Sequence, residues 1–301
     1  MSTTADPFVP PPRAARRNTA PGGSHVDDDL VSMLVVRGLP VRVSVRPATG
    51  HLVGAPPLLL CNGIGVSFEV LQPLVDALDP QRGVIRFDVP GVGGSPLPPS
   101  PYVLATLASW VSALTAKLGH PRFDVLGLSW GGGLAQQLAV QHRAKVHRLV
   151  LVATATGTLM VPAHPRVLAK MMTPRRHRDP EYARRIAGEI YGGTMRTDPE
   201  CGAELLHAAT RTGPRRGYYY QLAAAAGWSS LPFLGMVSQP TLLLAGDDDP
   251  IIPLVNAKVM ARLIPRAELH VYSGGHLGVL TESAELVPRI ERFLSAPDPT
   301  P

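Results

Sequence analysis

One serine of the chain lies among glycines in a pattern that favours nucleophilic chemistry. Residues 127–131 read G-L-S-W-G and fit G-x-S-x-G, with Ser129 at the centre. The preceding run F-D-V-L-G-L predicts a strand, and the following G-G-L-A-Q-Q-L-A-V-Q-H predicts a helix. At such a strand–turn–helix junction a serine adopts strained dihedrals, and small neighbours let strand and helix approach each other. The alternative is that the glycines serve only close packing.

A serine hydroxyl attacks a carbonyl group efficiently only when a base accepts its proton, so a histidine and an acid are also required. Two later predicted strands lead into suitable residues. T-L-L-L-A-G-D-D-D-P carries three aspartates, and A-E-L-H-V-Y-S-G-G-H ends in His276. We favour Asp249 as the acid because it lies farthest along its loop, with Asp248 as the second candidate. We favour His276 over the nine other histidines because it follows a terminal strand in a Gly-Gly loop.

Acyl transfer also needs N–H donors for the developing oxyanion. The backbone N–H of Trp130, directly after Ser129, is the first candidate. The loop Asn62-Gly63-Ile64-Gly65 follows the first long apolar run and supplies the second, the N–H of Ile64. An ordinary glycine turn at 62–65 is the alternative.

The elements around these residues predict an α/β fold. From residue 41 onward, short β-rich runs alternate with helical patterns, which is typical of a mainly parallel central sheet flanked by helices. The segment 41–46 alternates apolar and polar residues, as expected of an edge strand. The predicted strands are 41–46, 57–62, 83–89, 123–128, 146–154, 240–246 and 267–272, and the predicted helices are 104–118, 132–142, 254–264 and 282–294.

The strand–helix alternation is interrupted once, which predicts an insertion. Residues 156–238 contain helix-like pieces, prolines and aromatics without a clear buried strand, and we interpret them as a helical cap. The core then comprises 30–155 and 239–296. Residues 1–29 are rich in proline, glycine and charge and predict a disordered basic extension, and 297–301 predict a flexible tail.

The composition excludes several classes of protein. The chain has 301 residues, 45% of them hydrophobic, and no uncharged apolar run of about 18 residues that would predict a transmembrane helix. No apolar segment of about 7–15 residues follows Arg16-Arg17, so we expect a cytoplasmic protein rather than an exported one. Cys61 lies in an apolar run and is interpreted as a buried free thiol, with a disulfide to Cys201 as the alternative. No Cys/His cluster has metal-ligand spacing, so no metal or cofactor is expected.

Two further segments have structural and functional interpretations. D-V-P-G-V-G-G-S (88–95) is interpreted as a structural turn with Asp88 tied to backbone amides. The net charge of +6 comes partly from the arginine-rich segment 173–185, which we interpret as a solvated helical face. The alternative is a patch that meets an anionic surface, such as phospholipid around a storage body, and nucleic acid is not an expected partner.

The predicted cap offers side chains for an apolar substrate. Its segments 160–172 and 217–228 combine methionine, tyrosine and tryptophan with many alanines, which would leave room for alkyl chains. Simple packing of cap helices on the core explains the same composition. The candidate substrate-binding residues are Asn62, Met160, Tyr218, Tyr219 and Trp228.

From about Leu39 to Leu294 the chain resembles the α/β-hydrolase superfamily. Within it, the chain is similar to intracellular depolymerases of medium-chain-length poly(3-hydroxyalkanoate), the carbon-storage polyesters of bacteria. The segments that carry this resemblance are C-N-G-I-G, F-D-V-P-G-V-G-G-S, G-L-S-W-G-G-G-L-A-Q-Q, V-A-T-A-T-G-T-L-M-V-P, I-Y-G-G, G-Y-Y-Y-Q-L and L-A-G-D-D-D-P-I-I-P-L-V-N. The long basic segment before Val31 departs from the family pattern.

The resemblance implies a serine hydrolase with Ser129 as nucleophile, Asp249 as acid and His276 as base. The implied substrate is the polyester, cleaved through an acyl-serine to 3-hydroxyalkanoate monomers or oligomers, and the surface of storage granules is the implied partner. The alternatives are a general carboxylesterase or lipase with the same triad and, from another class, a granule-binding protein without activity. The sequence does not indicate an oligomeric state.

Overall fold

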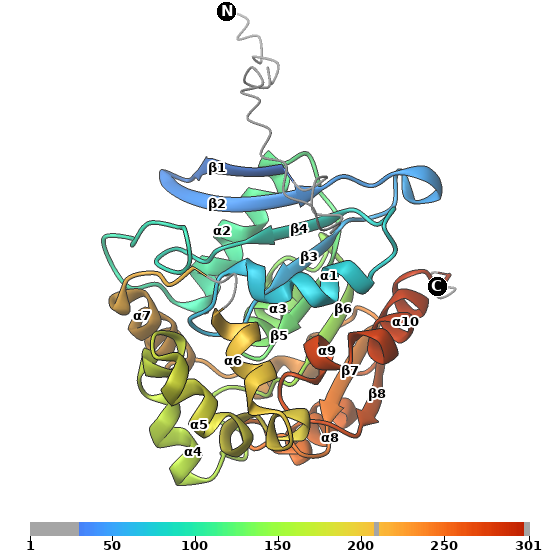
Figure 1. Ribbon diagram of the computed structural model, residues 1–301. Coiled ribbons are helices and arrows are strands. Elements are labelled where there is room, and N and C mark those ends of the chain that lie inside the picture. Colours follow the sequence, from blue (N-terminus) through green and yellow to red (C-terminus); the bar gives the residue numbers. More distant parts are fainter. Residues whose placement is uncertain (1–29, 208–210, 298–301) are drawn as a thin grey trace, which may run out of the picture.

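The computed structural model describes residues 30–207 and 211–297 of the chain (Figure 1). The predicted extension 1–29 and residues 298–301 of the predicted tail lie outside the described residues. Eight strands form one sheet in the order β1-β2-β4-β3-β5-β6-β7-β8. They are β1 (Leu30–Val36), β2 (Leu39–Arg46), β3 (Leu58–Cys61), β4 (Val84–Phe87), β5 (Phe123–Leu128), β6 (Val146–Val152), β7 (Thr241–Gly246) and β8 (Ala267–Tyr272).

The sheet is parallel from β4 to β8, and β1 and β2 add two antiparallel pairings at one side. This confirms the predicted mainly parallel sheet. Parallel strands require helical crossovers, which explains the alternation of strand and helix in the sequence. The parallel arrangement also places the carboxyl ends of β5, β7 and β8 at the same edge of the sheet. Ser129 follows β5, the three aspartates follow β7, and His276 follows β8.

The prediction that 41–46 forms an edge strand is wrong. These residues belong to β2, which pairs with β4 on one side and β1 on the other, so β1 is the edge strand. The alternation in β2 arises because Arg42 and Ser44 are buried on one side of the strand in hydrogen bonds with Asp88 and Arg86. Strand β1 was not predicted, since its residues LVSMLVV show no period-2 pattern and are mostly exposed.

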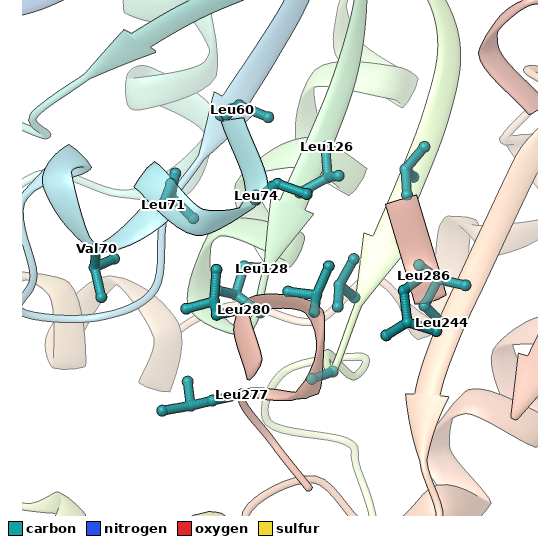
Figure 2. Close-up of a cluster of buried hydrophobic side chains, with 14 of the residues drawn as sticks. Leu60, Val70, Leu71, Leu74, Leu126, Leu128, Leu244, Leu277, Leu280 and Leu286 are labelled. Carbon is teal, nitrogen blue, oxygen red and sulfur yellow. The ribbon is translucent and has the colours of Figure 1, made fainter. Parts of the chain in front are cut away.

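Helices cover both faces of the sheet (Figure 1). The β3 side chains alternate between two cores: Leu58 and Leu60 lie in one, Leu59 and Cys61 in the other. One core packs against α2 (Leu104–Lys117), α3 (Trp130–Gln141) and α8 (Leu254–Leu263). The other packs against α1 (Gln72–Ala77), α9 (Gly278–Thr281) and α10 (Ser283–Leu294), and Figure 2 shows its leucines pointing toward one another.

Among the described residues between β6 and β7, helices alternate with turns and loops, and Gly157 forms an isolated bridge with Ser229. The elements of this segment gather at the lower left of Figure 1, away from β1 and β2. They are α4 (Pro165–Met171), η3 (Pro174–His177), α5 (Pro180–Tyr191), η4 (Gly193–Arg196), α6 (Pro199–His207), α7 (Arg215–Ala226) and η5 (Leu231–Met236). We propose that 156–238 act as a cap over a core made of 30–155 and 239–296.

Candidate active site

Ser129 occupies the sharp turn between β5 and α3. Its φ of 54° and ψ of −118° are unfavourable for a non-glycine residue and persist only where surrounding contacts hold them. The backbone N–H of Ser129 donates to the carbonyl of Val152 at 2.9 Å, and the hydroxyl of Thr154 donates to the Ser129 carbonyl at 2.7 Å. These bonds fix the turn and expose the side chain at the carboxyl end of the sheet.

The neighbouring glycines are required by close approach of backbone. A Cβ at Gly131 would lie 2.1 Å from the carbonyl oxygen of Cys61, and a Cβ at Gly132 would lie 2.4 Å from the hydroxyl oxygen of Thr154. Contacts this short do not occur, so larger residues would push α3 away from β3 and β6. The close packing considered from the sequence is therefore present together with the strained turn.

His276 follows β8 and reaches Ser129. Its Nε2 lies 2.9 Å from Ser129 Oγ, and its Nδ1 lies 2.8 Å from Asp249 Oδ2. The backbone N–H of His276 donates to the carbonyl of Tyr191 at 2.7 Å, and the two rings stack with centroids 6.4 Å apart. The imidazole is thus held from the cap side as well as by the carboxylate.

The three consecutive aspartates have three different environments. Asp249 is buried, and its Oδ1 accepts hydrogen bonds from the N–H groups of Ile251 and Ile252, both at 2.9 Å. Asp248 pairs at the surface with Arg196, which holds the pKa of that carboxyl below its usual range. Asp247 accepts from the N–H of Gly274 at 3.0 Å. Of the two candidate acids, the structure brings Asp249 to His276 and directs Asp248 elsewhere.

The two candidate oxyanion donors lie beside Ser129. Trp130 begins α3, whose N-terminus carries partial positive charge. Ile64 and Gly63 line the same cavity as Ser129, and a Cβ at Gly63 would lie 3.9 Å from Ser129 Cβ. The Asn62 amide donates to the carbonyls of Val66 at 3.3 Å and Ser67 at 2.8 Å and so shapes this loop.

A narrow cavity adjoins Ser129 and His276 between core and cap. The cavity has a volume of about 40 Å³, which is enough for a few water molecules. Its lining is mostly apolar, with a small polar group from the cap. The lining residues are Asn62, Gly63, Ile64, Val66, Val70, Leu128, Ser129, Met171, Arg176, His177, Tyr191, Leu206, Ile251, His276, Leu277 and Leu280.

Four of the five candidate substrate residues do not line this cavity. Tyr219 is 47% exposed. Met160 lies in a turn that is closed by a hydrogen bond from its N–H to the carbonyl of Gly157. The indole N–H of Trp228 donates to the side-chain oxygen of Gln137, and the ring packs against the core on the side of α2, α3 and α8. Tyr218 lines a separate small pocket with His177 and Gly65. Composition identified aromatic cap residues but not which side of each helix faces Ser129. Asn62 does line the cavity, although its amide is used within its own loop.

The interpretation of 173–185 as a solvated face is wrong for two of its basic residues. Arg176 and His177 are only 1% and 4% exposed and line the cavity. Their neighbours Arg175 and Arg178 are exposed, as predicted. The sequence signal was Pro174, which starts a short 3-10 helix: side chains three residues apart lie on the same side of such a helix, so Arg175 and Arg178 share the exposed side and the two residues between them are buried.

The interpretation of 88–95 as a structural turn is confirmed by the contacts of Asp88. Asp88 accepts from the N–H groups of Phe68 and Gly94, both at 2.8 Å, and pairs with Arg42, so the 88–95 segment is a structural turn. Cys61 and Cys201 are free thiols. Within 30–207 and 211–297, no cluster of three or more His, Cys, Asp or Glu side chains could hold a metal. In the same ranges, no helix is long and apolar enough to cross a membrane.

The family comparison agrees with this geometry. Residues 56–200 and 208–283 match the family model described as the alpha/beta hydrolase fold, and the chain belongs to this family. The predicted fold class is thereby confirmed. Within that family, the chain groups with a poly(3-hydroxyalkanoate) depolymerase of Ectopseudomonas oleovorans, to which it is 47% identical over 84% of its own length and 88% of the relative's.

More distant relatives share the fold and show other activities. A 3-oxoadipate enol-lactonase of Acinetobacter baylyi is 25% identical over 78% of this chain and 87% of its own. A crystal structure of a hydrolase from Pseudomonas aeruginosa superposes with a TM-score of 0.73 at 25% identity, covering 91% of this chain and all of that one. The fold alone therefore does not specify the substrate.

Proposed function

We propose that this protein hydrolyses the ester bonds of medium-chain-length poly(3-hydroxyalkanoate) through an acyl-serine intermediate. The observation that carries the proposal is the hydrogen-bonded series from Asp249 through His276 to Ser129 in a chain 47% identical to a poly(3-hydroxyalkanoate) depolymerase. The granule surface in the cytoplasm is the proposed site of action, because the polyester substrate is deposited there.

The proposed reaction begins with His276, which accepts the proton of Ser129 as Oγ attacks the ester carbonyl. The N–H groups of Trp130 and Ile64 stabilise the oxyanion, and removal of one such donor typically costs about 2.7–4 kcal/mol. His276 then protonates the departing 3-hydroxyl oxygen, and the ester C–O bond breaks. Water, deprotonated by the same histidine, releases the acyl group. Asp249 orients the imidazole and stabilises its charged form.

Turbidity of a medium-chain polyhydroxyalkanoate latex tests the proposal, with a short p-nitrophenyl ester assayed in parallel. The wild type should clear the latex and cleave the ester, and Ser129→Ala should do neither. Cleavage of the small ester without clearing would refute the depolymerase function and leave a general carboxylesterase with the same triad.

A further inference from the structure

Arg176 is a buried cation without a negative partner. Its side chain is 1% exposed, and its Nε has no hydrogen-bond partner within the described residues. No carboxylate is paired with it in the part of the chain that the structure describes. A buried, unpaired charge is costly, so it is retained where a ligand supplies the opposite charge. Arg175, next to it in the sequence, has a surface partner in Asp179.

The groups around the Arg176 guanidinium are neutral. Its Nη1 donates to the hydroxyl oxygen of Tyr218 at 2.9 Å and approaches the Thr173 carbonyl at 3.4 Å. Tyr191 also interacts with the guanidinium through its hydroxyl group. Burial raises the pKa values of Tyr191 and Tyr218, so neither phenol ionises to balance the charge. These bonds orient the guanidinium and leave donor capacity unused, since it carries five N–H groups.

His177 adds a second unused polar group beside Arg176. It is 4% exposed, and neither ring nitrogen has a hydrogen-bond partner within the described residues. Burial, assisted by the Arg176 charge, holds the pKa of His177 well below its usual range, so the imidazole is neutral. A neutral imidazole can donate one hydrogen bond to an anion.

Both residues line the cavity that contains Ser129 and His276. A guanidinium binds carboxylates with two parallel hydrogen bonds, which makes a carboxylate the fitting anion for this position. In a poly(3-hydroxyalkanoate) chain, one end carries a free carboxylate. Only two carbon atoms separate that carboxylate from the oxygen of the last ester bond, so a carboxylate held at Arg176 keeps this ester bond near it, and Ser129 lines the same cavity as Arg176.

We propose that Arg176, assisted by His177, binds the free carboxylate of the polyester chain end and directs Ser129 to the last ester bond. This inference rests on the proposed depolymerase function. Ser129 attacks the carbonyl of that ester, and the C–O bond to the terminal unit breaks. His276 delivers the proton to the departing oxygen, so that one 3-hydroxyalkanoate leaves with its carboxylate. Water then hydrolyses the acyl-serine, and the shortened chain has a new carboxylate end.

The test compares the free-acid dimer of 3-hydroxyoctanoate with its methyl ester, in which a methyl group masks the carboxylate and removes its negative charge. Wild type should cleave the internal ester bond of the free acid with a kcat/KM about 10-fold to 100-fold higher, the range given by hydrogen bonds to a charged group. Equal kcat/KM values for the two dimers would overturn the proposal.

Arg176→Gln identifies the residue responsible. It should remove the preference for the free acid, measured as the ratio of the two kcat/KM values within the same variant, so that a general loss of activity affects both dimers alike and does not enter the ratio. Arg175→Gln is the matched control, since it removes an adjacent arginine whose side chain is 58% exposed, and it should retain the full preference. A preference that persists in Arg176→Gln would overturn the assignment.

Product inhibition keeps the test valid if Arg176→Gln does not fold. Free 3-hydroxyoctanoate should inhibit p-nitrophenyl ester hydrolysis by wild type at a concentration at least about 10-fold lower than methyl 3-hydroxyoctanoate does. Equal inhibition by the two would contradict a carboxylate site.

If wild type clears latex and cleaves both dimers equally, only the carboxylate proposal fails. If it cleaves neither latex nor dimers, the depolymerase function itself fails.

Discussion

The carboxylate of Asp249 selects the tautomer of His276 that can accept a proton from Ser129. Its Oδ1 is held by the N–H groups of Ile251 and Ile252, and its Oδ2 faces His276 Nδ1. In Asp249→Asn the two N–H groups would keep the amide oxygen at the Oδ1 position, so the amide NH₂ would face Nδ1. An NH₂ group only donates, so Nδ1 would become the acceptor and Nε2 would carry the proton. The lone pair that receives the Ser129 proton would then be lost.

We expect kcat for p-nitrophenyl ester hydrolysis to fall by about 10⁴-fold in Asp249→Asn, as for the corresponding change in a serine protease. That loss corresponds to about 5 kcal/mol of transition-state stabilisation. The melting temperature should change little, because both backbone hydrogen bonds to the side-chain oxygen remain. Retention of kcat within about tenfold of wild type would refute this reasoning, since the wrong tautomer cannot act as the base.

Asp248→Asn is the matched control at the adjacent position. It weakens a surface pair with Arg196, in which the Asp248 and Arg196 side chains are 42% and 50% exposed, and a hydrogen bond from the N–H of Gly193; such exposed ion pairs contribute about 0–1 kcal/mol. We expect an unchanged kcat and a slightly lower melting temperature near neutral pH. Because Arg196 lowers the pKa of Asp248, the difference in melting temperature should shrink as the pH falls below about 4 and vanish below the lowered pKa. A loss of kcat equal to that of Asp249→Asn would assign the acid to Asp248 instead.

Three further substitutions or measurements test the packing around the site. Gly131→Ala should lower both the melting temperature and kcat, because its Cβ would lie 2.1 Å from the Cys61 carbonyl oxygen. Gly235→Ala is the control: its Cβ would meet open space, so it should behave like wild type in both assays. Gly217→Ala would place a Cβ 1.7 Å from a carbonyl oxygen of the loop after β4, so thermal unfolding should show destabilisation, and a wild-type melting curve would contradict the close docking of α7. Cys61 is buried and Cys201 is partly exposed, so mass spectrometry after thiol labelling of native protein should show modification at Cys201 and not at Cys61 until denaturant is added.

The sequence predicts the elements that are buried on both faces of the sheet. The runs that became β3, β5 and β7 are almost wholly apolar, because the parallel strands lie between two helical layers. The order of Ser129, Asp249 and His276 could also be predicted, since each follows a strand whose carboxyl end lies at the same edge. Strand β1 could not be predicted, because its pairing with β2 leaves most of its side chains exposed and gives no periodic signal.

The lining of the cavity depends on tertiary contacts that local patterns do not encode. Arg176 lies in an arginine-rich segment, where the usual environment is solvent, and it is buried because α5 packs against η3 and Tyr218 of α7 contacts its guanidinium. Tyr218 and Tyr219 are adjacent in the sequence, yet one is buried and the other half-exposed. Residue type therefore predicted an apolar site in the cap but not the side chains that reach Ser129.

The most direct test of the central claim is the mass of the Ser129 peptide after reaction with a short 3-hydroxyoctanoate oligomer. Wild-type protein is mixed with the oligomer, quenched in acid within the first turnover and digested. We expect a 3-hydroxyacyl adduct on the peptide containing Ser129, absent from Ser129→Ala and lost from wild type at longer times as water releases the acyl group. Hydrolysis of the oligomer with no adduct on this peptide at any time, or equal hydrolysis by Ser129→Ala, would contradict an acyl-serine mechanism.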